Sequence, residues 1–190
     1  MVGNLSNFSK IDVLRCFMLL DKNASRSELS KVLELGEGTV RTILDILKSK
    51  GLLDSTKKGH FLSGKGLATF MKIGSGVGRL RLVAFAKFYP ELKKAALIVK
   101  NIENLRQVYK LRDVAVKSGA DGALILKYNK KLTAAESDYD DFDEIENLFK
   151  LEENDVLIIA FSNKKRQAEN GALSVAVELN APLKKFAEEF

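Results

Sequence analysis

The side chains best suited to chemistry lie along residues 36–48, on one side of a predicted helix. Its apolar residues recur at i, i+3, i+4 and i+7 and form one buried stripe, made of Val40, Ile43, Leu44 and Leu47. On the opposite side, arginine can make a two-pronged contact to guanine, and threonine can donate to a phosphate or touch a thymine methyl group. The outward residues are Glu37, Gly38, Thr39, Arg41, Thr42, Asp45 and Lys48. This pattern is typical of a helix that enters the major groove of DNA, and also of an ordinary amphipathic surface helix.

A second group of candidates follows this helix directly. The run that begins at Leu52 turns at residues 57–59 and returns through residues 60–62, which predicts a β-hairpin with a positively charged end. Lys57, Lys58 and His60 would meet phosphate or the minor groove, contacts that fix position more than sequence. A solvated turn would contain the same residues.

The neighbouring segments predict the elements that position these side chains. Ser25 and Glu28 form a capping-box pattern that begins a helix over Arg26 to about Leu33, and Ser9 is a plausible N-cap for a helix over about residues 10–21. Only two residues separate the second helix from the third, so the two should cross steeply. Gly51 should end the third helix, and a fourth helix is expected over about residues 64–73.

Three helices, a tight turn and a basic hairpin in this order resemble the winged helix-turn-helix domains of bacterial and archaeal transcriptional regulators. The motifs that carry the resemblance are Ser-Arg-Ser-Glu-Leu (25–29), Gly-Glu-Gly-Thr-Val-Arg-Thr-Ile-Leu (36–44), Lys-Gly-Leu-Leu (50–53) and Phe-Leu-Ser-Gly-Lys-Gly (61–66). Residues 36–42 are most similar to the N-terminal domain of the central glycolytic gene regulators. The resemblance covers residues 9–73 and implies a DNA-binding domain over residues 1–73. Regulators of this shape bind two half-sites, so we expect a homodimer on double-stranded DNA.

The remainder predicts a glycine-rich linker over residues 74–78 and a small α/β domain over residues 79–190 that senses an effector or mediates dimerisation. Its expected strands cover residues 79–88, 95–100, 123–128 and 155–161, with helices at 105–117 and 168–179 and a short helix after Pro182. On the first strand one face should carry Leu80, Leu82, Ala84, Ala86 and Phe88. A strand, a helix and a strand in succession predict a parallel or mixed sheet.

Two polar segments of this half invite a ligand. A basic loop follows the strand at 155–161 and precedes a helix; it consists of Ser162, Asn163, Lys164, Lys165 and Arg166. Free N–H groups at a helix start, together with lysines, favour binding of a small anionic metabolite. The alternative is an exposed basic loop without a ligand. The carboxylates of the acidic run from Glu136 to Glu146 could bind a metal ion. The run lacks the pattern of a calcium-binding loop, so a flexible, solvated connection is favoured.

Composition limits the class of protein. With 190 residues, 46% of them hydrophobic, the chain is long enough for one domain of moderate size or two small ones. No apolar run approaches the ~20 residues that span a bilayer, and no secretory signal is evident, so we expect a cytoplasmic protein without a membrane partner. Cys16 lies in an apolar pattern and is interpreted as a buried thiol. Residues 1–78 carry 12 Lys and Arg against 7 Asp and Glu, which fits a polyanion partner.

These patterns predict a sequence-specific DNA-binding transcriptional regulator of α/β class, with the winged helix-turn-helix first and the small α/β domain second. It is expected not to be an enzyme and to need no cofactor, because the only histidine is on the hairpin and no phosphate-loop lysine motif or zinc-binding cysteine pair occurs. Two alternatives stay open: a small-molecule kinase-like enzyme with a winged-helix appendage, and a winged-helix module that binds protein.

Overall fold

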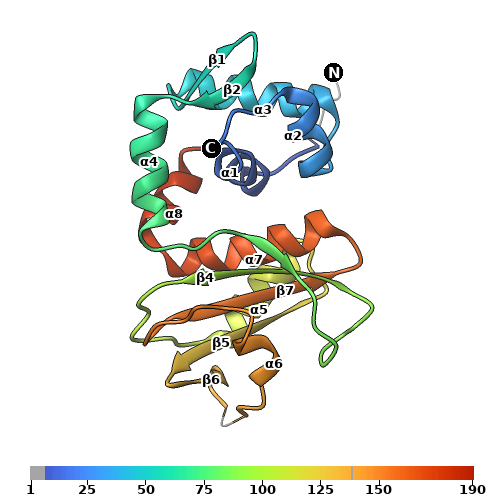
Figure 1. Cartoon of the computed structure of the whole chain (residues 1–190), viewed down its shortest axis with the longest axis vertical. Helices are drawn as coiled ribbons and strands as arrows, with labels where there is room; N and C mark the ends of the chain where they lie inside the picture. Colours follow the sequence, from blue (N-terminus) through green and yellow to red (C-terminus); the bar gives the residue numbers. More distant parts are fainter. Residues whose placement is uncertain (1–6, 138) are drawn as a thin grey trace. The chain divides into compact units, whose positions relative to one another are not determined.

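The computed structural model describes residues 7–137 and 139–190, and Figure 1 shows their course. Within these residues the protein is mixed α/β, with eight helices and two antiparallel sheets. The chain divides into two compact units. The first contains the chain up to Ile73 together with residues 185–190, which the sequence assigned to the second domain. The second unit contains residues 74–184.

The first unit is built from helices and one hairpin. In chain order it contains α1 (Lys10–Met18), α2 (Arg26–Leu33), α3 (Glu37–Ser49), β1 (Leu53–Thr56), β2 (Gly59–Leu62), α4 (Gly64–Gly74) and the end of α8 (Ala181–Glu188). Helix α1 ends at Met18, before the predicted residue 21. Leu20 is buried, but it lies in the turn that follows the helix. An apolar residue in such a turn continues the helical pattern without continuing the helix.

Local signals in the sequence explain the ends of α2 and α3. Ser25 Oγ accepts the Glu28 N–H at 3.2 Å and Glu28 Oε2 accepts the Ser25 N–H at 2.7 Å, which confirms the predicted capping box. At the end of α3, Gly51 adopts a φ of 70°, a left-handed conformation that favours glycine. The Leu52 N–H then reaches the Leu47 carbonyl at 3.0 Å, so the helix ends where the sequence predicts.

The core of the first unit is apolar and close-packed. The stripe of α3 is buried as predicted, with Val40, Ile43 and Leu47 at 0% exposure. The Phe17 and Phe186 rings lie 4.6 Å apart between centroids, which fixes the end of the chain against α1. Cys16 is buried, as the sequence indicates, and burial raises the pKa of its thiol to about 12.

The second unit contains a five-stranded sheet with the strand order β3-β4-β7-β5-β6. The inner strands are β4 (Lys93–Val99), β7 (Val156–Ser162) and β5 (Gly122–Asn129). Strand β7 pairs antiparallel with both neighbours, and every described pairing in the sheet is antiparallel. The predicted parallel or mixed pairing was therefore wrong. Strands β4 and β5 do run in the same direction, as a strand–helix–strand unit requires, but β7 inserts between them.

The sheet edges differ from the sequence prediction. Strand β3 covers only Arg81–Val83 of the expected 79–88. Val83 packs against the core and Leu82 is 50% exposed, so the prediction that Leu82 shares a face with Phe88 on one strand was wrong. Phe85 and Phe88 lie after the strand and also pack in this core. Strand β6 (Lys131–Ala134), which pairs with β5, was not predicted.

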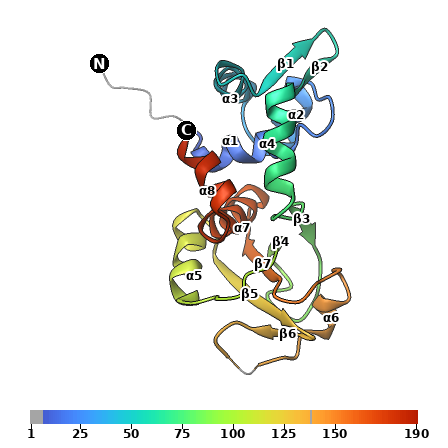
Figure 2. The same cartoon turned by 90° about the vertical axis from the view of Figure 1, so that its left-hand side faces the viewer.

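Helices cover one face of the sheet and a loop layer covers the other. Figure 2 shows α5 (Val108–Lys117) and α7 (Lys165–Leu179) on one face and α6 (Asp143–Glu146) on the other. Gly171 lets α7 approach the sheet, because a Cβ there would lie 3.1 Å from the Cβ of Ala160. On the opposite face, Phe85 and Phe142 pack against Leu157 and Ile159 of β7.

The glycine-rich stretch predicted as a linker is partly attached to this sheet. The Gly78 N–H donates to the Ile98 carbonyl at 2.7 Å, and the Gly76 carbonyl accepts the Lys100 N–H at 2.9 Å. The described part of the chain includes no helix of the length and hydropathy that a membrane span needs.

Candidate nucleic-acid interface

Helix α3 presents a polar surface opposite its buried stripe. Arg41 and Asp45 are 72% and 68% exposed, and the Arg41 Nε lies 3.9 Å from an Asp45 carboxylate oxygen. Such an exposed, long ion pair contributes little stability, so the guanidinium can exchange this partner for another acceptor. Lys48, one turn further along the helix face, is also exposed, and its Nζ lies 2.6 Å from the Ser55 hydroxyl of β1.

The beginning of α3 carries small residues that its own fold does not require. A Cβ built on Gly36 or Gly38 would have no atom within 4 Å, and both glycines are exposed. Thr42 donates its hydroxyl to the Gly38 carbonyl at 3.2 Å, which leaves its methyl group and oxygen lone pairs for a partner. Thr39 is half-buried beside them. A large molecule can therefore approach the helix backbone closely at this end.

An ion pair joins the starts of α2 and α3. Arg26 Nε lies 3.3 Å from Glu37 Oε2, with both side chains about half exposed. Glu37 is thus already paired with a basic residue. Arg26 is not among the site residues predicted from the sequence; the signal that could have indicated it is its position as the first residue of the helix before α3.

The hairpin carries its two lysines at the tip. Strands β1 and β2 pair from Leu53–Leu62 to Thr56–Gly59, so Lys57 and Lys58 form the two-residue turn, and both are exposed. The Lys58 N–H donates to the Thr56 hydroxyl at 3.2 Å. These contacts hold the backbone of the turn while the lysine side chains remain in solvent.

The start of β2, next to the tip of the hairpin, is fixed to the turn between α1 and α2. Ala24 and His60 exchange both backbone hydrogen bonds, at 3.0 and 2.9 Å. Gly59 permits this approach, because its φ is 129° and a Cβ there would lie 2.7 Å from the Ala24 carbonyl oxygen. Together with the contact from Lys48 to Ser55, this bridge fixes the hairpin beside α3.

His60 lies on β2 opposite Ser55, one residue beyond the Thr56–Gly59 pair that closes the turn. It is half-buried, and its Nδ1 has no hydrogen-bond partner among the described residues. Burial lowers its pKa below the ordinary value of 6.5, and the charges of Lys48 and Arg26 lower it further, against an opposing effect of Asp45. Residues from α2, α3 and the hairpin therefore converge around this imidazole.

The predicted anion loop in the second unit is largely used by its own neighbours. Ser162 is buried and donates its hydroxyl to Gln167 Oε1 at 3.1 Å, and the Asn163 N–H donates to a carboxylate oxygen of Asp121 at 3.2 Å. Lys165 pairs with Glu169 at 3.8 Å. Lys164 is the N-cap of α7, and Arg166 is half-buried in its first turn. The Asp121 carboxylate thus accepts one of the N–H groups that an anion was expected to use, and the anion site stays a prediction.

The acidic run is mostly exposed, as the predicted solvated connection requires, but several of its carboxylates accept backbone N–H groups. Glu136 accepts the N–H groups of Gln107 and Val108 at the start of α5, at 2.8 and 3.2 Å. A carboxylate there also interacts favourably with the helix dipole. Glu144 and Glu146 accept backbone N–H groups in the same way.

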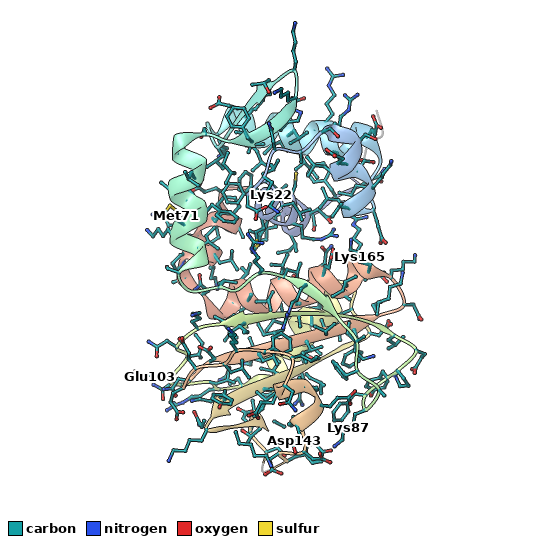
Figure 3. The ribbon with its side chains drawn as sticks, in the orientation of Figure 1. Lys22, Met71, Lys87, Glu103, Asp143 and Lys165 are labelled. Atoms are coloured by element: carbon teal, nitrogen blue, oxygen red, sulfur yellow. The ribbon has the colours of Figure 1, made fainter. Side chains whose placement is uncertain are left out.

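Other acids of this run form ion pairs at the surface of the second unit. Asp141 pairs with Lys87 and raises its pKa, and Asp140 pairs with Lys131 at 3.1 Å. Lys87 and Asp143 carry their side chains at the surface (Figure 3). Asp138 lies outside the described residues. Within the described ranges, no group of three or more His, Cys, Asp or Glu is arranged to hold a metal ion.

Comparisons with known proteins divide the chain in a similar way. Residues 11–68 match the family described as "PH0730-like, N-terminal domain", and residues 91–179 match "Domain of unknown function (DUF4443)". Among solved structures, the hypothetical protein PH0730 from Pyrococcus horikoshii OT3 is similar, with 27% identity and a TM-score of 0.78 over 95% of this chain and 100% of that one. No curated protein matches.

Proposed function

We propose that this protein is a sequence-specific DNA-binding transcriptional regulator that acts in the cytoplasm. In this proposal the first unit is a winged helix-turn-helix domain, α3 enters the major groove, and the β1–β2 hairpin is the wing. Arg41 reads a base edge, Thr39 and Thr42 contact phosphate or a thymine methyl group, and the tip lysines bind phosphate.

The observation that carries the proposal is the division of α3 into two faces. Its apolar stripe is 0–2% exposed, so the helix is rigidly held. Its opposite face presents an exposed arginine beside two glycines that packing does not require. A fixed helix with an exposed donor and a small N-terminal end meets the steric and hydrogen-bonding demands of the major groove.

The hairpin adds a second point of contact at a fixed place. His60 joins the hairpin to the α1–α2 turn by two backbone hydrogen bonds, and Ser55, which pairs with His60, joins it to α3 through Lys48. Its tip presents two exposed lysines. A hairpin that is anchored next to its tip, with cationic side chains in solvent, suits phosphate binding, which sets the register of a protein on the duplex.

Two further parts of the proposal concern assembly. We propose that two copies bind a roughly palindromic operator, and that the second unit mediates pairing or senses a small molecule. Light scattering of the protein alone and on DNA gives the number of copies. One copy per duplex site would contradict the homodimer and leave DNA binding itself intact.

The direct test is binding to DNA by fluorescence anisotropy, with bound sequences first selected from random duplexes. Arg41→Ala should weaken binding to the selected site by about 1–3 kcal/mol and relax sequence preference at one base pair. Lys58→Ala should weaken binding to all sequences and reduce the slope of log K against log salt by ~1. Lys117→Ala, which removes the same charge from the exposed end of α5, is the matched control.

A steric variant separates DNA binding from folding. Gly38→Gln adds a side chain where the fold leaves open space, and it replaces glycine by a better helix former, so stability should be kept or raised. The same side chain would obstruct close approach of DNA, and binding should fall. If the original protein does not bind DNA, and Arg41→Ala and Lys58→Ala do not change this result, the proposal is contradicted and a protein partner is favoured.

A further inference from the structure

The second unit contains a pocket that the proposed DNA contacts do not use. Its volume is about 600 Å³, within the range of roughly 300–1,000 Å³ found for small-molecule sites. It lies where the short edge strand β3 and the end of β4 meet the segment that follows α6. It is separate from the loop at residues 162–166, which the sequence suggested as an anion site.

Cations gather on the wall of this pocket. Arg79 and Arg81 come from the β3 region, and Lys150 comes from the segment after α6. Among the described residues that line it, none is acidic. The like charges of Arg81 and Lys150 border the same hollow, and an anion placed between them reduces their repulsion.

One of these cations is held in place by two contacts. The Arg81 guanidinium carbon lies 4.2 Å from the centre of the Phe149 ring, and its Nη2 donates to the Leu148 carbonyl. Both partners belong to a segment far away in the sequence, so the arginine is fixed before any ligand arrives. A guanidinium that is already oriented loses little conformational freedom on binding, and its planar fork matches the oxygens of a phosphate.

The rest of the lining is apolar or neutral. Ile98 and Phe149 supply apolar surface next to the cations, and Asn147 adds an amide. A ligand that fills the pocket therefore has an anionic end and an apolar body, and an aromatic ring can pack against Ile98 and Phe149. A phosphate monoester carries a charge of about −1.5 to −2 at neutral pH, which balances the two charges of Arg81 and Lys150 better than a single carboxylate does.

We propose that this pocket binds a phosphate monoester joined to a flat ring, as in a nucleoside monophosphate. Arg81 and Lys150 hold the phosphate, and the ring lies against Ile98 and Phe149. The proposal concerns the second unit alone and does not depend on DNA binding by the first.

Isothermal titration of the full chain tests the proposal with AMP and phenyl phosphate as probes. At least one probe should bind. Inorganic phosphate, which lacks the ring, and adenosine and phenol, which lack the phosphate, should each bind at least about tenfold more weakly. Lys150→Gln, at an exposed position that leaves β3 untouched, should weaken binding of that probe by about tenfold. Arg81→Gln should weaken it at least as much, and Lys117→Gln should leave it unchanged.

The results that would overturn the proposal are equally specific. Absence of binding by both probes at millimolar concentration would do so. So would equal affinity of a probe and inorganic phosphate, since the apolar surface would then contribute nothing. Unchanged binding by Lys150→Gln would show that a bound probe sits elsewhere.

Discussion

Gly66 of α4 offers a sharp test of the packing in the first unit. A Cβ at this position would lie 2.0 Å from the Leu52 carbonyl oxygen and 3.0 Å from its carbonyl carbon. Carbon–oxygen contacts between backbones normally begin at about 3.3 Å, so Gly66→Ala must push α4 away from the start of the hairpin by more than 1 Å. Neither atom belongs to a flexible side chain that could turn aside.

The expected loss of stability follows from two opposing effects. Overpacking of this kind costs about 1–3 kcal/mol, and the upper end applies because both partners are backbone. Replacing glycine by alanine within a helix returns about 1 kcal/mol. The net loss in the free energy of unfolding of the first unit is therefore about 2 kcal/mol.

Gly64 of the same helix provides the matched control. A Cβ there has no atom within 4 Å, so Gly64→Ala should stabilise by about 0.5 kcal/mol, through reduced freedom of the unfolded chain. The two variants differ by one methyl group two residues apart. A gap of about 2.5 kcal/mol corresponds to melting temperatures about 10–20 °C apart for a domain of this size.

The aromatic residues allow the two units to be followed separately. The chain has no tryptophan, and its four tyrosines all lie in the second unit, so tyrosine fluorescence reports that unit while far-UV circular dichroism reports helices of both. The dichroism midpoint should fall for Gly66→Ala and not for Gly64→Ala. Equal midpoints for the two variants would refute the close approach of α4 to Leu52.

Two further predictions concern titratable side chains. The pKa of His60 is below its ordinary value in the folded protein, so the unfolded chain binds the extra proton more readily, and stability should fall as the pH drops from about 7 to 5. Denaturant titrations should show this fall in the original protein and a smaller one in His60→Gln; an equal slope in both would contradict the assignment to His60. Cys16, with a pKa of about 12, should resist iodoacetamide at about pH 8 until the protein is unfolded, and rapid alkylation of the folded protein, followed by mass spectrometry, would show that the thiol is not buried.

The sequence predicts the first unit well because its signals are local. Ser25 and Glu28 are three residues apart, Gly51 follows the helix that it ends, and the tip of the hairpin is a two-residue turn. Each of these features depends on hydrogen bonds or backbone conformations within a few residues. Placing Arg26 beside Glu37, or His60 against Ala24, needs the packing of the elements as well.

The second unit is less predictable because its pairings are distant in sequence. The apolar run of β7 correctly indicates a strand, but nothing in residues 93–129 indicates that it will lie between β4 and β5. The acidic run looks like a solvated segment, since its carboxylates find their N–H partners on α5, β6 and the segment before β4 only after folding. The pocket beside Phe149 likewise unites residues that are far apart in the chain.

The inner position of β7 has a consequence for synthesis on the ribosome. Domains form from the N-terminal side as the chain emerges, and β4 and β5 are made long before β7. Until then both strands expose a bare, apolar edge, the kind of surface that associates with other unfinished chains. A nascent polypeptide that stops before Val156 therefore keeps the unpaired edges of β4 and β5. We expect such a chain to be bound by chaperones or degraded rather than to fold into a stable fragment.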